Sequence, residues 1–170
     1  MVLRVRHAVL EDAALIAAIH VRTWQVAYRG LMPDELLDGL LVEQREERWQ
    51  QALGEGGSAT YVAVEDAAVV GFCAVAAPSR DDDAQDGVAE IGAIYVEPSV
   101  WRTGTGRALM DVALADLRAD GWRQLTLWVL AENQPARDFY SQFGLMPDGA
   151  EMTHAGSGAT ELRLRGSIAT

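Results

Sequence analysis

The sequence predicts an α/β or α+β fold in which helices and strands mix within one domain. Runs of β-branched and aromatic residues typical of buried strands recur along the chain, separated by segments whose apolar residues have helical spacing. At about 88–120 and again at about 124–143, a strand leads through a short loop into a helix. The 170 residues contain no internal repeat and no linker, so we expect a single domain over residues 1–170.

The first half of the chain is predicted to contain both helices and strands. Asp12 fits the N-cap of the first helix, and Gly30 interrupts the chain after that helix. A tight turn at 66–68 joins two short strands as in a β-hairpin, although it lacks the Asn-Gly or Asp-Gly signal. The expected elements are a strand at 3–7, a helix from Glu11 towards Tyr28, a short helix from Pro33, a charged helix at about 42–53, and strands at 60–65 and 69–76.

The second half is predicted to alternate strands with helices before its pattern weakens. Gly121 and Gly144 stand just after the two expected helices, where glycine commonly ends a helix. Residues 78–87 form an acidic loop that we expect to be exposed. The expected elements are strands at 88–96 and 124–130, helices at about 105–120 and 135–143, and a last pair of strands at 146–152 and 160–164.

The chain is strongly acidic, with 25 acidic and 14 basic residues and a formal net charge of −11. We therefore expect no nucleic-acid partner. The charge, and the 81–83 aspartates in particular, would suit a cationic small molecule, although solubility and a solvated loop, which need no function, are the favoured explanation. Residues 1–7 have no apolar signal core, and no apolar stretch approaches the ~20 residues needed to span a bilayer. We expect no membrane partner and a cytoplasmic location.

The single cysteine, Cys73, excludes an intramolecular disulfide. It lies in the apolar run Val69–Val75, which favours a buried structural thiol. A covalent acyl-cysteine route is the alternative. No cluster of histidine, cysteine and carboxylate residues has metal-ligand spacing, so we expect no metal.

The loop after the 88–96 strand is suited to binding phosphate. Gly104 and Gly106 let the backbone approach a ligand closely, and the loop leads into a helix whose N-terminal N–H groups attract anions. Arg102 and Arg107 flank the glycines. Arg107 stands where a P-loop needs lysine, and Leu109 stands where a dinucleotide-binding fingerprint needs its third glycine, so both motifs are excluded.

Two segments resemble the GNAT superfamily of acetyl-CoA-dependent N-acetyltransferases. Residues 101–106, Trp-Arg-Thr-Gly-Thr-Gly, resemble its pyrophosphate loop Gln/Arg-x-x-Gly-x-Gly/Ala. They depart from this pattern at the first position, where Trp101 replaces Gln or Arg. A plain left-handed turn between strand and helix is the alternative. Residues 133–145 resemble the family segment Asn-x-x-Ala-x-x-Phe-Tyr-x-x-x-Gly-Phe and depart from it only at Leu145.

The resemblance implies a mixed central β-sheet of about six to seven strands flanked by helices. In this family the two parallel strands, here 88–96 and 124–130, splay apart and admit the pantetheine arm of the co-substrate acetyl-CoA. Asn133 would cap the following helix or bridge to the cofactor. Ala136 is small enough to let the cofactor lie against that helix. The implied cofactor-binding residues are Ile94, Tyr95, Val96, Arg102, Thr103, Gly104, Thr105, Gly106, Arg107, Asn133 and Ala136.

Acetyl transfer to an amine needs a proton acceptor for the amine and a proton donor for the leaving thiolate. The resemblance points to Glu90, fourteen residues before Gly104, as the general base. A mostly apolar strand would raise its pKa, whereas a glutamate in solvent is the alternative. Regular alternation would place Glu90 on one face with Gly92, Ile94 and Val96.

Tyr140 stands where the family often places a catalytic acid. A phenol with a pKa of about 10 can donate a proton to a thiolate. The alternative role for Tyr140 is to pack the helix on the sheet. A backbone N–H of a bulged strand around Tyr95 would meet the oxyanion.

In this family the region at the end of the first helix forms the acceptor side, so the resemblance implies that Trp24 and Tyr28 are substrate-binding residues. His20 shares their helical face, and we expect it to pack on the sheet. His154 is either a loop histidine or a base in the pocket.

The sequence thus predicts an N-acetyltransferase that moves the acetyl group of acetyl-CoA to a primary amine of a small molecule in a ternary complex. A non-catalytic acyl-CoA-binding or sensing module and a protein N-terminal acetyltransferase are the alternatives. The oligomeric state stays open, with a homodimer among the options.

Overall fold

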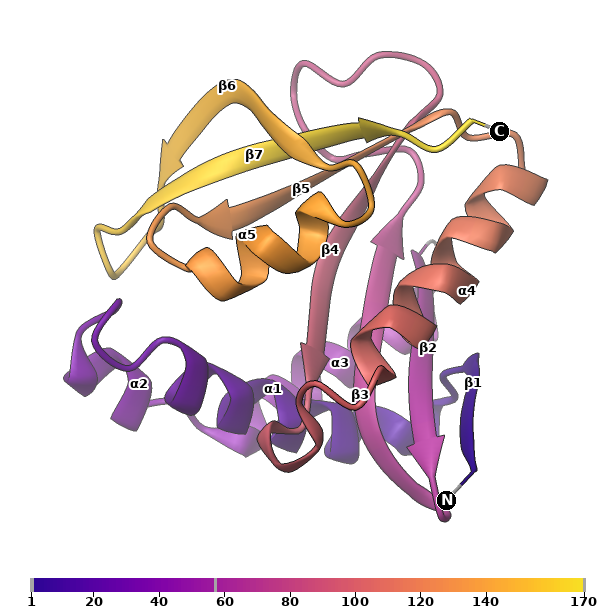
Figure 1. Cartoon of the computed structure of the whole chain (residues 1–170). Helices are drawn as coiled ribbons and strands as arrows, with labels where there is room; N and C mark the ends of the chain where they lie inside the picture. The colour runs from indigo at the N-terminus through magenta and orange to yellow at the C-terminus, as the bar shows by residue number, and fades with distance from the viewer. Residues whose placement is uncertain (1, 57, 170) are drawn as a thin grey trace.

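The computed structural model describes residues 2–56 and 58–169. They form one seven-stranded mixed sheet with the strand order β1-β2-β3-β4-β5-β7-β6, which confirms the expected fold (Figure 1). The elements in chain order are β1 (Leu3–His7), α1 (Ala13–Ala27), α2 (Asp34–Asp38), α3 (Val42–Glu55), β2 (Ser58–Glu65), β3 (Ala68–Ala76), β4 (Val88–Val96), α4 (Thr105–Ala119), β5 (Gln124–Leu130), α5 (Gln134–Ser141), β6 (Met146–Thr153) and β7 (Thr160–Ser167).

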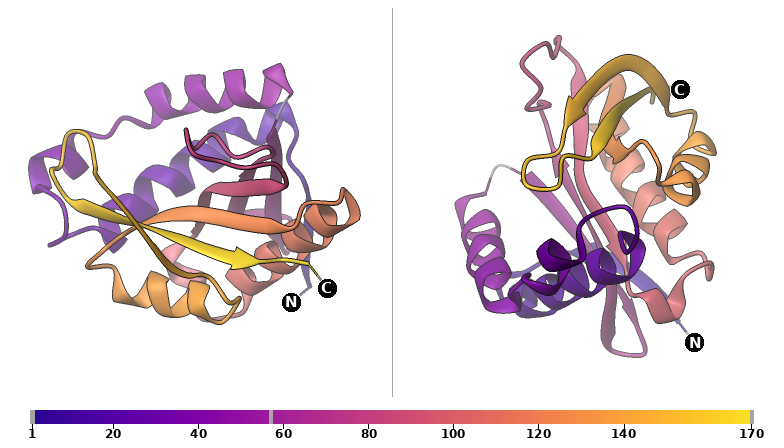
Figure 2. Two further views of the ribbon diagram at one scale, coloured as in Figure 1. Left: turned by 90° about the horizontal axis from the view of Figure 1, so that it is seen from above. Right: turned by 90° about the vertical axis from the view of Figure 1, so that its left-hand side faces the viewer.

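The helices cover both faces of the sheet. Figure 2 shows α1 and α3 on one face and α4 and α5 on the other. The α1 and α3 side has a core around Ile16, Trp49 and Phe72, and the α4 side has a larger core around Leu109 and Leu127. Apolar residues on both faces of the central strands therefore explain their continuous hydrophobic runs.

The parallel pair β4 and β5 is joined along only part of its length. Residues 88–91 of β4 pair with 124–127 of β5, and no pairing follows beyond Ile91 and Leu127. The other neighbouring strands pair in antiparallel fashion. The C-terminal ends of β4 and β5 thus separate in the middle of the sheet, as the family resemblance implies.

A β-bulge in β4 changes which side chains share a face. Ala74 of β3 pairs with Ala93, whereas its neighbour Val75 pairs with Ile91, so Gly92 is the extra residue. Glu90 consequently lies on the same face as Ala93 and Tyr95, towards α1 and α3. The predicted regular alternation is wrong, because a bulge shifts the period of two by one residue. The bulge also lies at Gly92 rather than around Tyr95.

Ile94 and Val96 lie on the opposite face of β4 from Glu90. Ile94 pairs with Cys73, and both side chains pack in the core beneath α4. Cys73 is fully buried, and burial raises the pKa of its thiol to about 12. The predicted structural thiol is confirmed, since a thiol with that pKa stays protonated and unreactive near neutral pH.

Two local predictions need a correction in detail. The β2–β3 turn is tighter than expected, with only Asp66 and Ala67 between the strands, both at positive φ of 48° and 71°. Asp12 does precede α1, but its carboxylate accepts from the Val9 N–H at 2.8 Å and pairs with Arg6 rather than capping α1.

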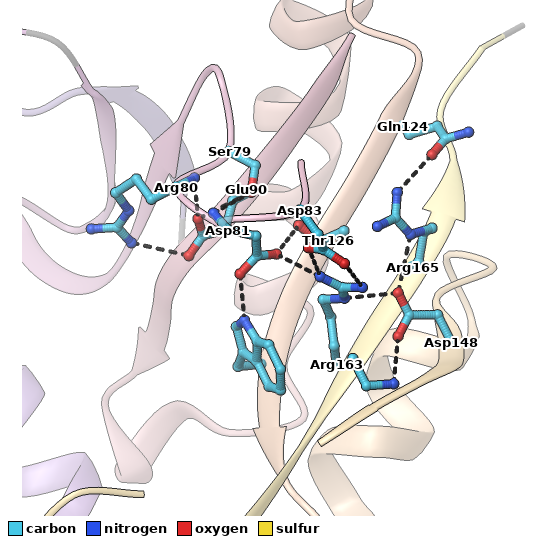
Figure 3. A network of polar contacts seen from close by, with 12 residues as sticks. Ser79, Arg80, Asp81, Asp83, Glu90, Gln124, Thr126, Asp148, Arg163 and Arg165 are labelled. Atoms are coloured by element: carbon cyan, nitrogen blue, oxygen red, sulfur yellow. Dashed lines mark hydrogen bonds and ion pairs between the residues drawn. The ribbon is translucent and has the colours of Figure 1, made fainter. Parts of the chain in front are cut away.

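The acidic loop between β3 and β4 is only partly solvated, so the prediction of an exposed loop is wrong for Asp81. Its carboxylate accepts from the Trp128 indole N–H at 2.8 Å and lies 3.4 Å from Nη1 of Arg163 (Figure 3). Arg163 is buried and also bonds Asp83 and Asp148. The loop is thereby fixed across β5 and β7, strands that lie far from it in the sequence.

Candidate active site

A cavity of about 960 Å³ opens where β4 and β5 separate. Its walls come from α1, the ends of β4 and β5, the 97–104 loop with the start of α4, α5, and the β6–β7 hairpin. Of the predicted site residues, the structure places in its wall Glu90, Tyr140, Ile94, Tyr95, Val96, Arg102, Gly104, Gly106, Arg107, Asn133, Ala136, Trp24 and Tyr28. Thr103 and Thr105 belong to the same loop but do not line the cavity.

The glycine loop presents free backbone donors to the cavity. Gly104 has a φ of 96° and is the N-cap of α4, and the N–H groups from Arg102 to Arg107 donate to no group in the described part of the chain. Free N–H groups at a helix N-terminus together with the positive end of the helix dipole favour an anion. The loop thus has the geometry of a phosphate site.

The side chains of the loop explain how it tolerates the departure at Trp101. The Trp101 indole N–H donates to the Val96 carbonyl at 2.7 Å, which attaches the loop to the end of β4. The Thr103 hydroxyl donates to the Val100 carbonyl at 2.8 Å and lies 3.0 Å from the buried Thr105 hydroxyl. These bonds shape the loop and leave its backbone donors free.

The two predicted arginines differ in their freedom. Arg107 donates to the Gln142 side chain at 2.9 Å, and its guanidinium lies 5.2 Å from the centre of the Phe143 ring. Arg102 is exposed and has no hydrogen-bond or ion-pair partner among the described residues. Arg102 is therefore the guanidinium that can turn to a bound anion without breaking a contact.

Helix α5 lies against the start of α4 and forms the next wall. A Cβ on Gly106 would lie 3.3 Å from the Phe139 ring, tighter than an ordinary contact, so the glycine permits this close approach. Asn133 accepts from the Ala136 N–H at 3.3 Å, which confirms the expected cap. This bond uses the Asn133 carbonyl oxygen and leaves its amide N–H groups available.

Tyr140 projects from α5 into both the core and the cavity. It packs against the α4-side core and lines the cavity, and its hydroxyl has no hydrogen-bond partner among the described residues. Burial raises the pKa of this phenol above its ordinary value. The Tyr140 hydroxyl therefore keeps its proton near neutral pH.

Glu90 is buried but not in apolar surroundings. Its carboxylate accepts from the Arg80 N–H at 2.9 Å, from Arg80 Nη2 at 3.1 Å and from the Ser79 hydroxyl at 3.4 Å (Figure 3). The expectation of a mostly apolar environment is wrong, because the loop before β4 folds back onto the strand. A Cβ on Gly92 would lie 2.7 Å from Arg80 Nη2, so the bare glycine leaves room for this guanidinium.

The end of the cavity at α1 is aromatic with a few polar atoms. Trp24 and Tyr28 line it, with ring centres 5.1 Å apart, and the hydroxyls of Tyr28 and Tyr95 lie 3.4 Å from each other. Burial raises the pKa of both tyrosines. The Trp24 indole N–H is buried without a hydrogen-bond partner in the described part of the chain, so it is available to a bound molecule.

His20 lies outside this wall, as predicted. It is buried beneath Tyr95, with ring centres 4.9 Å apart, and its Nδ1 accepts from the Trp49 indole N–H at 3.2 Å. Burial, with a smaller contribution from Arg45, lowers the pKa of His20 to about 3. A neutral, hydrogen-bonded histidine in the core is a packing residue.

The sequence reasoning missed Glu161 and Arg80. Glu161 is the second residue of β7, is half-buried and lines the cavity, and burial raises the pKa of its carboxyl. His154, which sequence reasoning left open between a loop role and a pocket base, lines the same end, with its Nδ1 2.8 Å from the Ser157 hydroxyl. The alternation of residues 160–164 was the available signal for Glu161, whereas nothing local links Arg80 to Glu90.

Comparison with known proteins assigns the family. The chain belongs to the acetyltransferase (GNAT) family, whose model matches residues 18–145. YuaI of Bacillus subtilis, named an uncharacterized N-acetyltransferase, is 31% identical over 140 residues, which are 82% of this chain and 78% of the relative. The predicted membership is thus confirmed, and the protein is an acyltransferase of this family.

Solved structures share the fold. PaiA N-acetyltransferase from Thermoplasma acidophilum, in complex with coenzyme A, has a TM-score of 0.80 at 17% identity and covers 98% of this chain and 99% of its own. YncA from Salmonella typhimurium, with its cofactor acetyl-CoA, has a TM-score of 0.74 at 18% identity and covers 100% of this chain and 96% of its own.

Across residues 2–56 and 58–169, no group of three or more histidine, cysteine or acidic side chains has an arrangement that could hold a metal ion. In the same residues, no helix combines the length and the apolar character needed to cross a bilayer.

Proposed function

We propose that this protein transfers the acetyl group of acetyl-CoA to a primary amine of a small molecule, directly and within a ternary complex. One observation carries the proposal: a single cavity connects the free N–H groups of the glycine loop, the Tyr140 hydroxyl, the Glu90 carboxylate and an aromatic end at α1. The relatives with bound coenzyme A or acetyl-CoA support the choice of co-substrate. We infer that the chain acts as one catalytic domain, since all these groups surround one sheet.

The residues of the glycine loop fit the pyrophosphate of acetyl-CoA. The free N–H groups from Arg102 to Arg107 would hold the phosphate oxygens, and the Arg102 guanidinium would add charge. The splayed edges of β4 and β5 would receive the pantetheine arm, whose amide groups can bond to unpaired strand backbone. When bound, acetyl-CoA supplies the thioester that is attacked.

Glu90 and Tyr140 are the residues proposed to move protons. The Glu90 carboxylate, or a water that it holds, would accept the proton of the attacking amine, while the Arg80 contacts fix the carboxylate in place. The Tyr140 hydroxyl would donate its proton to the departing thiolate. Cys73 is buried with a raised pKa and takes no part, which leaves direct transfer as the route.

The test is release of the CoA thiol from acetyl-CoA across a panel of small primary amines. With an accepted amine, Tyr140→Phe should lower kcat by about 10²–10⁴-fold, the usual contribution of acid–base catalysis, because the ring and its packing remain while the proton is lost. Acetyl-CoA affinity, measured by calorimetry, should change little. Tyr61→Phe is the matched control, since it removes a phenol that donates to Asp116 outside the cavity.

Two outcomes would overturn the proposal. Tight binding of acetyl-CoA without turnover of any amine would identify an acyl-CoA-binding module. Activity of Tyr140→Phe within about twofold of wild type would reduce Tyr140 to a packing residue, since general acid catalysis contributes far more than that.

A further inference from the structure

We propose that the amine acceptor carries a second, cationic group, and that Glu161 binds this group at the α1 end of the cavity. The acceptor class is a linear diamine, or another amine with a second ammonium group at a distance. This inference rests on the proposed acetyl transfer and names its substrate class.

The position of Glu161 is fixed by the sheet. It pairs with Leu130, the last residue of β5, on one side and with Met152 of β6 on the other. Leu130 packs in the small core that contains Trp24 and Tyr28. The Glu161 carboxylate therefore belongs to the same wall as the aromatic residues of α1, at the end of the cavity where β5 finishes.

Glu161 is the partly buried carboxylate of this cavity whose oxygens accept no hydrogen bond and form no ion pair in the described part of the chain. Glu90 is paired with Arg80, and Asp138 is exposed and accepts from the Gln134 side chain. Glu161 is half-buried, and no hydrogen bond or ion pair reaches its carboxylate within residues 2–56 and 58–169. A partly buried carboxylate without a partner is costly to keep charged, and a ligand cation would supply the missing partner.

The neighbours of Glu161 favour a cation as that partner. The groups that face it are the Tyr28 and Tyr95 hydroxyls and His154; the imidazole offsets part of the effect of burial on the Glu161 pKa, but no arginine pairs with the carboxylate among the described residues. The rings of Trp24 and Tyr28 line the same end, and aromatic faces attract ammonium groups. The Arg45 guanidinium lies 5.6 Å from the centre of the Trp24 ring but forms no ion pair with Glu161 among the described contacts.

Glu90 and Glu161 would then act on the two ends of one acceptor. Glu161 would hold the charged ammonium, while Glu90 would take the proton from the other amine as it attacks. A monoamine of the same chain length would reach the reacting position without the anchor. Selectivity should therefore appear as a preference for diamines over monoamines of matched length.

The experiment compares linear diamines of increasing length with monoamines of matched length, in wild type and in Glu161→Gln, which keeps the shape of the side chain and removes its charge. The ratio of kcat/KM for the best diamine to that for its matched monoamine should fall at least about tenfold in the variant, the size expected for a lost charged hydrogen bond. The loss should lie in the KM for the diamine. Glu151→Gln, on the exposed part of β6, should keep the wild-type ratio.

A second measurement does not depend on turnover. Calorimetric titration of the protein saturated with CoA should show tighter binding of the diamine than of the monoamine, and Glu161→Gln should abolish the difference. Equal affinity for both amines in wild type, or an unchanged difference in Glu161→Gln, would overturn the inference. Turnover of monoamines without preference would overturn it while leaving the proposed acetyl transfer intact, and absence of all turnover would count against the transfer alone.

Discussion

At the scale of single residues, burial decides which groups can act. Cys73 is fully buried and Tyr140 is half-buried, and burial raises the pKa of each. For a thiol nucleophile this is disabling, because the thiolate is the reactive form. For a phenol that must donate a proton, the same effect keeps the protonated, active form populated and at the same time makes it a weaker acid. The same physical effect thus removes one candidate and keeps the other.

The raised pKa of Tyr140 predicts the alkaline side of the pH–rate profile. A phenol with the ordinary pKa of about 10 would begin to lose its proton above about pH 9. Because burial raises the pKa of Tyr140, kcat should not fall between pH 8 and about pH 10 through loss of this proton. Steady-state rates at saturating amine check this, with circular dichroism as the control for an intact fold. A decline of kcat centred at about pH 9 that is absent from the Tyr140→Phe profile would contradict this prediction.

At the scale of elements, one extra residue in β4 changes which side chains point to each face of the strand, and the two faces have different proposed functions. The bulge at Gly92 directs Glu90 and Tyr95 towards α1, while Ile94 and Val96 face α4. The proposed base and Tyr95 thereby lie on the acceptor side, whereas Ile94 and Val96, two of the residues proposed to contact acetyl-CoA, lie on the side of the glycine loop. Without the bulge, Glu90 and Ile94 would share a face.

The loop before α4 offers a test of the proposed phosphate site. Gly104 has a φ of 96°, and a Cβ there would meet no atom within 4 Å. Gly104→Val should therefore destabilise the fold only by the strain of a left-handed residue, about 1–2 kcal/mol. By moving the N–H groups of the loop, it should abolish acetyl-CoA binding in calorimetry.

Gly149→Val is the matched control for this variant. Gly149 has the same φ of 96° and equally free space, but it lies on the edge strand β6 and does not line the cavity. Its variant should bear a similar strain and bind acetyl-CoA as wild type does. Unchanged affinity in a folded Gly104→Val would remove the glycine loop from the cofactor site.

At the scale of the whole molecule, local sequence patterns predicted the helices and strands. The features that these patterns failed to predict depend on contacts between residues distant in sequence. The order of helices and strands, the splayed pair and the family were predicted correctly, since periodicity, capping glycines and motifs are local signals. The bulge at Gly92 depends on the partner strand β3. The fixing of Asp81 depends on Arg163, 82 residues later. That Glu161 stays unpaired depends on the whole cavity, so no local pattern reveals it.

The core around His20 predicts how the stability of the molecule depends on pH. Burial lowers the pKa of His20 to about 3, whereas the unfolded chain has the ordinary value of about 6.5. Between these values the unfolded state binds more protons than the folded state. The stability from neutral His20 is therefore complete above about pH 6.5 and is lost as the pH falls towards about 3.

For wild type, this group alone should lower the free energy of unfolding by about 2 kcal/mol between pH 7 and pH 5. His20→Asn keeps an acceptor for the Trp49 indole N–H but does not titrate. Between pH 7 and pH 5, the free energy of unfolding of this variant should therefore fall by about 2 kcal/mol less than that of wild type. Urea unfolding at the two pH values measures the difference. A His20→Asn protein whose stability changes with pH as wild type does would show that protonation of His20 does not oppose folding.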